Sequence, residues 1–162
     1  MGFDTMTPLS LMNSANCEGC LDVDGFTYQR SYTIRKVSDE KLKFNIEGEE
    51  VNGVLVSDNV RLEKGNDDLQ VKEFPFLLVN SWKQSESQNV NGVIGLSKSH
   101  YTSTGERSGP EFLESLFQAG VINNKIFAVH FDKFGGSTIE FGGYSPDKIV
   151  PNVPLTYLEI PY

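Results

Sequence analysis

The chain has 162 residues, a length that fits one domain or one lobe of a two-lobed enzyme. Its hydrophobic share of 38% is enough to bury a core, which excludes wholesale disorder. With 14 basic and 22 acidic residues the net charge is −8, which argues against nucleic acid and against an anionic membrane surface as partners. No apolar run approaches the roughly 20 residues that span a bilayer.

Alternating apolar and polar residues predict a β-rich protein. Strands are expected, in chain order, at residues 26–32, 41–46, 51–62, 69–71, 74–79, 126–131, 137–141 and 155–160. Turn-forming residues separate them at 47–48, 64–68, 135–136 and 142–143. The pattern therefore favours an all-β fold.

One short helix is expected at residues 110–119. Pro110 suits a first helical position, and Gly120 suits the left-handed residue that ends a helix. The helix carries one apolar stripe, formed by Phe112, Leu113, Leu116 and Phe117. A single stripe predicts packing against a sheet.

The two cysteines, Cys17 and Cys20, form one Cys-x-x-Cys. A zinc site needs about four ligands, and only the distant His100 and His130 could join, so no metal site is expected. A thioredoxin-like redox pair belongs where a strand feeds a helix, whereas this pair lies in an expected loop. A local disulfide or two reduced thiols are left. We favour the disulfide, which implies an oxidising compartment.

Two segments carry most of the functional information. The first is Phe3-Asp4-Thr5, and the second is Asn91-Gly92-Val93-Ile94-Gly95-Leu96. In this order, and over nearly its whole length, the chain resembles the pepsin-like aspartic peptidases. That family carries Phe-Asp-Thr-Gly-Ser or Ser-Asp-Thr-Gly in each lobe, followed later by two hydrophobic residues and Gly. The resemblance implies a pepsin-like acid protease fold, with residues 1–162 forming a single N-terminal lobe that stops before the second lobe.

The resemblance assigns catalytic roles. Asp4 would be a catalytic carboxylate, and Thr5 would brace its loop by hydrogen bonds. Val93, Ile94 and Gly95 would thread the loop and hold it rigid. In such an enzyme two aspartates share a proton across a water molecule, one acting as general base and the other as acid. A second lobe or a partner chain is then needed to complete the pair.

The resemblance also implies a substrate-binding flap and a disulfide. Ile46, Glu47 and Gly48 would lie near the tip of the flap, and Cys17 and Cys20 would close the small loop that follows the catalytic motif in the family. Secretory, lysosomal or vacuolar localisation would follow. No cofactor and no metal are expected.

The sequence departs from the family pattern at two places. Met6 stands where the family has Gly, so a bulky side chain occupies a position where backbone approaches the aspartates. Ile46 stands near the position of the flap's Tyr.

Three functions are compatible with these observations. The first is one lobe of an aspartic endopeptidase that is inactive alone. The second is a degenerate pepsin-like domain that binds peptides or proteins, or that has a structural role. The third is a single-lobe peptidase that dimerises, so that each chain supplies one aspartate.

Overall fold

The computed structural model describes residues 2–20, 25–46, 49–63, 66–82, 90–98 and 111–158. The chain divides into two compact units, residues 1–121 and residues 122–162. In the described ranges, no helix is both long enough and apolar enough to cross a membrane.

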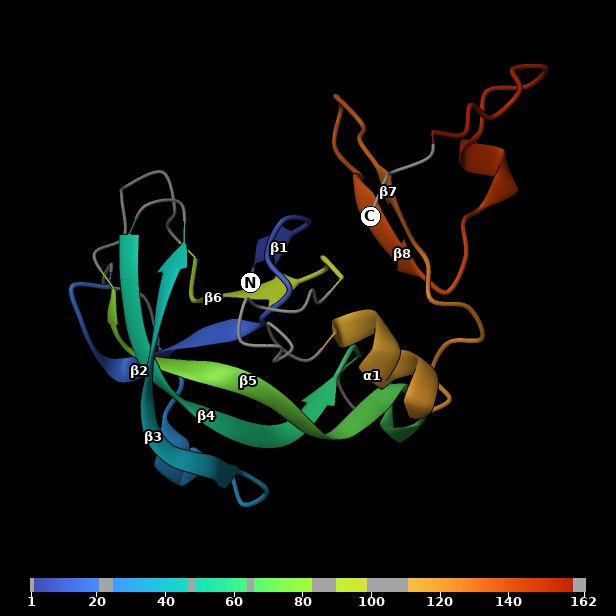
Figure 1. Ribbon diagram of the computed structural model, residues 1–162. Coiled ribbons are helices and arrows are strands. Elements are labelled where there is room, and N and C mark those ends of the chain that lie inside the picture. The colour runs from blue at the N-terminus through green and yellow to red at the C-terminus, as the bar shows by residue number, and fades with distance from the viewer. Residues whose placement is uncertain are drawn as a thin grey trace. The chain divides into compact units, whose positions relative to one another are not determined.

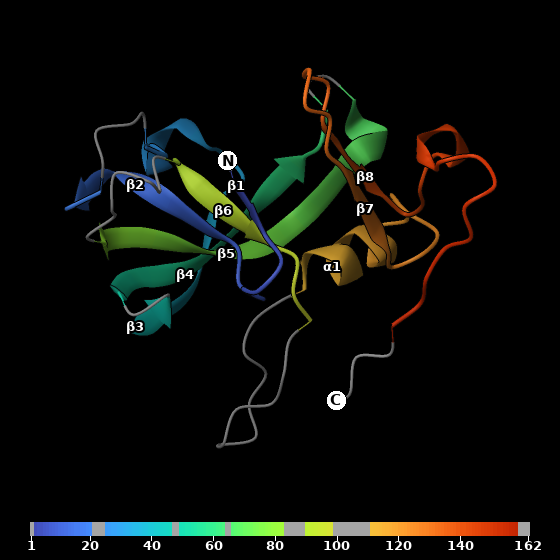
Figure 2. The same cartoon turned by 90° about the horizontal axis from the view of Figure 1, so that it is seen from above.

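The first unit is built on a six-stranded sheet (Figure 1). Its strands are β1 (Gly2–Asp4), β2 (Leu11–Glu18), β3 (Arg35–Ile46), β4 (Glu49–Arg61), β5 (Gln70–Trp82) and β6 (Gly92–Gly95). They lie in the order β1-β6-β2-β5-β4-β3, so β6 returns from late in the unit to lie between the first two strands. Figure 2 shows β1, β6 and β2 side by side. The expected β-rich fold is confirmed.

The core of this unit lies between the chain near residue 10 and the long central strands. One cluster in it consists of Leu9, Leu11, Val51, Leu77, Val79 and Trp82. Leu11 and Leu77 are paired residues on the parallel strands β2 and β5, and both are essentially inaccessible to solvent. Burial of such side chains contributes about 1.5–3 kcal/mol each. The segment that follows Asp4 is therefore anchored in the core.

The two strands expected at residues 69–71 and 74–79 form one strand, β5. A bulge at Glu73, with φ of 53°, joins them, and the Asn59 side chain accepts a hydrogen bond from the Glu73 amide at 3.1 Å. Pro75 is tolerated because it precedes the part of β5 that pairs with β2. The strands expected at 41–46 and 51–62 correspond to the longer β3 and to β4.

Two predicted strands are wrong. Within residues 26–32, Phe26 makes a single bridge to Ser14, and Tyr28–Arg30 is a 3-10 turn. Tyr32 is 94% exposed, so the alternating pattern there has no buried face. Residues 155–158 form no strand and are exposed, and residues 159–160 lie outside the described ranges.

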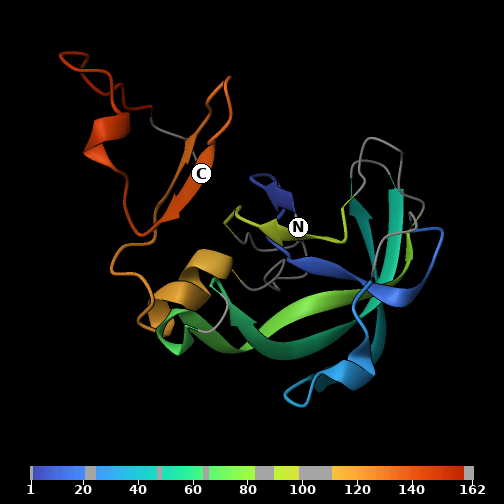
Figure 3. The same ribbon diagram turned by 180° about the vertical axis from the view of Figure 1, so that it is seen from behind.

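The helix α1 (Phe112–Gln118) is shorter than expected, and Pro110 lies outside the described residues. Phe112 and Leu116 are buried, whereas Phe117 is exposed. The Phe112 ring meets Phe74 of β5 edge-on, with ring centroids 5.4 Å apart. Figure 3 shows α1 alongside β5. Gly120 ends the helix with φ of 72°, as predicted.

The second unit contains an antiparallel pair of strands, β7 (Phe127–His130) and β8 (Thr138–Phe141). Both lie within the predicted ranges 126–131 and 137–141. Gly135 and Gly136, in the turn between them, have φ of 98° and 88°. A 3-10 turn at Pro146–Lys148 follows β8.

Candidate active site

Asp4 lies at the end of β1, beside the second motif. The strands β1 and β6 are parallel, and Asp4 is in register with Gly95. The Leu96 amide donates a hydrogen bond to the Asp4 carbonyl oxygen at 2.8 Å. Two motifs about ninety positions apart in the sequence are thus neighbours in the sheet, as the resemblance implies.

The Asp4 side chain is half-buried and is held by its own loop. The Met6 amide donates a hydrogen bond to Asp4 Oδ1 at 2.8 Å. This is the local turn that Asp readily forms with the backbone two residues later. The carboxylate therefore has a fixed direction at the end of the strand.

Thr5 and Met6 follow on the solvent side of the loop. Thr5 is exposed, and its bracing role stays a prediction. The Met6 side chain is 85% exposed, and Phe3, on the preceding strand, is 46% exposed. The bulky residue that replaces the family's Gly is accommodated by pointing into solvent.

Gly95 packs directly against the loop that follows Asp4. A Cβ at this position would lie 2.8 Å from the Leu9 carbonyl oxygen and still closer to that of Thr7. The Gly95 amide donates to the buried Ser10 hydroxyl at 3.2 Å, and the Ser97 amide donates to the Thr7 carbonyl at 3.3 Å. Residues 95–97 therefore fix the course of residues 7–10.

Val93 and Ile94 connect this contact to the sheet. Val93 is in register with Gly2 on one side and with Leu11 on the other, and it packs against the core cluster. Ile94 is in register with Phe3. Both residues are half-buried.

The residues expected in the flap belong to the β3–β4 hairpin, and their role in a flap stays a prediction. Ile46 ends β3 and pairs with Glu49 at the start of β4. Glu47 and Gly48 lie outside the described residues. The Asn52 amide group, and then the Lys43 ammonium, hold the pKa of the exposed Glu50 carboxyl below its ordinary value.

Glu49 and Trp82 form a contact that the sequence did not indicate. The buried Trp82 indole N–H donates to Glu49 Oε2 at 2.9 Å. Trp82 belongs to the core cluster that includes Leu9 and Leu11. The start of β4 is thereby tied to the core that supports the Asp4 loop.

We predict that Trp82→Phe removes this hydrogen bond and loosens the hairpin. A hydrogen bond to a charged group contributes about 1.5–3 kcal/mol, so amides of residues 44–46 and 49–51 should exchange faster with deuterium. Glu49→Gln, which keeps an acceptor oxygen, should have a smaller effect. Unchanged exchange in Trp82→Phe would contradict the role of this contact.

Cys17 and Cys20 are joined by a disulfide, with Cα atoms 5.6 Å apart, which confirms the favoured interpretation. Both residues are half-buried, and they pack against the core cluster. The disulfide closes the end of β2. Of the two histidines, His130 lies on β7, and His100 lies outside the described residues.

No curated protein matches the chain. Residues 3–160 match the family model described as eukaryotic aspartyl protease, which covers nearly the whole chain and includes both motifs of the site. The chain therefore belongs to the eukaryotic aspartyl protease family.

Proposed function

We propose that this chain supplies one aspartate, Asp4, to an aspartic endopeptidase that hydrolyses peptide bonds through an aspartate pair and a water molecule. The supporting observation is the position of the Asp4 carboxylate, which the Met6 amide holds at the strand end beside Gly95. Rigid presentation of a carboxylate is what such chemistry needs, because its direction must be set before substrate binds.

The chemistry requires a second carboxylate. Two close carboxylates cannot both ionise at low cost, so they titrate as a pair that shares one proton. The ionised member takes a proton from water as the water attacks the peptide carbonyl, and the protonated member donates to the carbonyl oxygen. The 162 residues contain one Asp-Thr motif and no Asp-Thr-Gly or Asp-Ser-Gly. The partner aspartate would come from another lobe or another copy, and the chain alone would be inactive.

A second candidate is a domain that binds a peptide or protein without cleaving it. Met6 at 85% exposure and Phe3 at 46% exposure present apolar side chains next to Asp4. Exposed apolar side chains at one place favour contact with a partner. Met6 also occupies the position where the family uses Gly.

The test is cleavage of a denatured, fluorescently labelled protein at acidic pH, with and without a statine-type inhibitor. The chain alone at low concentration should be inactive. Activity that rises with the square of chain concentration, together with a dimer in light scattering, would identify a second copy as the source of the other aspartate. Activity that needs a separate second lobe would identify a two-lobe enzyme.

Binding without cleavage would favour the second candidate. The first expected result is saturable binding of a peptide near Phe3 and Met6. The second is that neither the native chain nor Met6→Gly cleaves the substrate, even when the second aspartate is supplied. Met6→Gly is informative because it restores the family residue without altering Asp4.

A further inference from the structure

The second unit contains a cavity of about 310 Å³ whose lining includes neither Asp4 nor its neighbours in the sheet. Its walls are one face of the β7–β8 pair, the chain that follows β8, and the 3-10 turn at Pro146–Lys148. Cavities of this volume fall at the lower end of the range that holds small molecules. All of its lining residues belong to residues 128–155, so the second unit forms it by itself.

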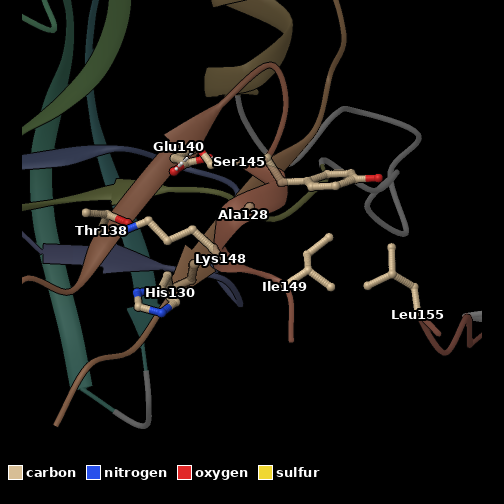
Figure 4. A pocket seen from close by; sticks show the side chains of 10 residues that line it. Ala128, His130, Thr138, Glu140, Ser145, Lys148, Ile149 and Leu155 are labelled. Carbon is tan, nitrogen blue, oxygen red and sulfur yellow. Dashed lines mark hydrogen bonds between the residues drawn. The ribbon is translucent and has the colours of Figure 1, made fainter. Parts of the chain in front are cut away.

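One end of the cavity is polar and carries the Lys148 ammonium, and the Glu140 carboxylate also belongs to the lining. His130 and Thr138 are cross-strand neighbours, and the Lys148 side chain reaches across the strands toward Thr138 (Figure 4). Lys148 makes no ion pair within the described part of the chain. His130 Nδ1 is buried and has no hydrogen-bond partner among the described residues. This nitrogen is closed off from solvent, so His130 lines the cavity through its other atoms.

The Glu140 carboxylate, which also lines the cavity, already accepts hydrogen bonds from Ser145. Glu140 accepts hydrogen bonds from the Ser145 amide at 2.7 Å and from the Ser145 hydroxyl at 2.8 Å, one on each oxygen. These bonds fix the chain after β8, and the Lys148 amide in turn donates to the Ser145 carbonyl at 3.0 Å. Glu140 therefore positions the turn that carries Lys148.

The other end of the cavity is apolar. Figure 4 shows Ile149 and Leu155 on the side away from Thr138 and His130. Val129 and Tyr144 add further apolar surface to the lining. The cavity thus offers the Lys148 ammonium and the Thr138 hydroxyl at one end, and hydrocarbon at the other.

We infer that this cavity binds a small carboxylate with an apolar body, the carboxylate lying beside Lys148 and Thr138 and the apolar part against Ile149 and Leu155. Charge-assisted hydrogen bonds from an ammonium to a carboxylate are among the stronger ones in proteins. Both a free short-chain fatty acid and the C-terminal residue of a peptide with an apolar side chain have this chemistry. The inference goes beyond the proposed function and does not depend on cleavage.

The experiment measures binding of hexanoate to the full chain by NMR, with calorimetry for affinity. Signals of the His130 ring and of residues 128–130 and 138–140 should shift. Affinity should rise about fourfold per methylene from acetate to hexanoate, and hexanol, which lacks the charge, should bind at least about tenfold more weakly than hexanoate.

Lys148→Met keeps the aliphatic stem and removes the charge, so it should weaken hexanoate binding by about tenfold or more. Lys133→Met is the matched control, because the Lys133 ammonium lies 4.7 Å from the centre of the Phe134 ring and does not line the cavity. It should leave the affinity unchanged.

Comparison of N-acetyl-leucine with 4-methylpentanoate separates the two sources of the carboxylate. Tighter binding of N-acetyl-leucine would identify a peptide C-terminus, and tighter binding of 4-methylpentanoate a free acid. Three results would overturn the inference. They are hexanol binding as tightly as hexanoate, equal losses of hexanoate affinity in the two lysine variants, and no NMR shift at His130. None of these outcomes bears on the Asp4 chemistry.

Discussion

Under the proposed function, Asp4→Asn is expected to lower kcat/KM for peptide hydrolysis by about 10²–10⁴-fold once a second aspartate is supplied. Asn has nearly the same shape as Asp, but it can neither ionise nor hold the shared proton. The Met6 amide can still donate to the Asn Oδ1, as it does to Asp4 Oδ1 at 2.8 Å, so the loop should keep its conformation. The loss should appear in kcat at every pH where the native enzyme is active.

The matched control is Asp39→Asn. Its side chain is 95% exposed and, among the described residues, forms an ion pair with Lys36 on the same strand, so removing its charge should leave activity unchanged. Thermal unfolding of both variants should match that of the native chain closely. Near-native activity in Asp4→Asn would remove Asp4 from the mechanism.

Gly95→Ala is expected to destabilise the first unit by about 3 kcal/mol or more. The added Cβ would meet the carbonyl oxygens of Thr7 and Leu9, which are backbone atoms and cannot rotate away. The loop is also held from both sides, because Ser97 binds the Thr7 carbonyl and Gly95 binds Ser10. Relief of the clash must therefore break the contacts that direct residues 7–10.

Urea denaturation of Gly95→Ala and of Gly2→Ala tests this prediction. Gly2 also lies in a paired strand of the same sheet, but the nearest atoms to an added Cβ there are 3.7 Å away, an ordinary contact. The midpoint should fall strongly only in Gly95→Ala. Equal midpoints in the two variants would show that residues 7–10 can move away from β6 at little cost.

The fold was predictable where the sequence carries a long alternating pattern or a specific motif. β4 and β8 were expected from periodicity, and the neighbourhood of Asp4 and Gly95 from the resemblance to a family. Residues 26–32 were misassigned because their alternation is not matched by a buried face, as the 94% exposure of Tyr32 shows. An alternating pattern shows which side chains would favour burial. Whether other elements pack over them depends on the tertiary fold.

Contacts between side chains on different elements could not be predicted from the sequence. The Glu49–Trp82 hydrogen bond joins residues 33 positions apart and depends on the register of β4 and β5. The polar end of the cavity likewise depends on the His130–Thr138 pairing and on the turn that carries Lys148. Neither residue type nor spacing reveals such register, so these features could come only from the structure.

The packing of Gly95 against the Asp4 loop has a consequence for biosynthesis. The hydrogen bond from Gly95 to Ser10 joins residues 85 positions apart, and ribosomes add about 5–20 residues per second. At those rates, roughly 4–17 s pass between the synthesis of Ser10 and the synthesis of Gly95 in β6. During that interval β6 is absent, so Leu9 and Leu11 lack the contacts that β6 makes with them. We therefore expect chaperones to bind these two residues in a nascent chain that is stalled before residue 91.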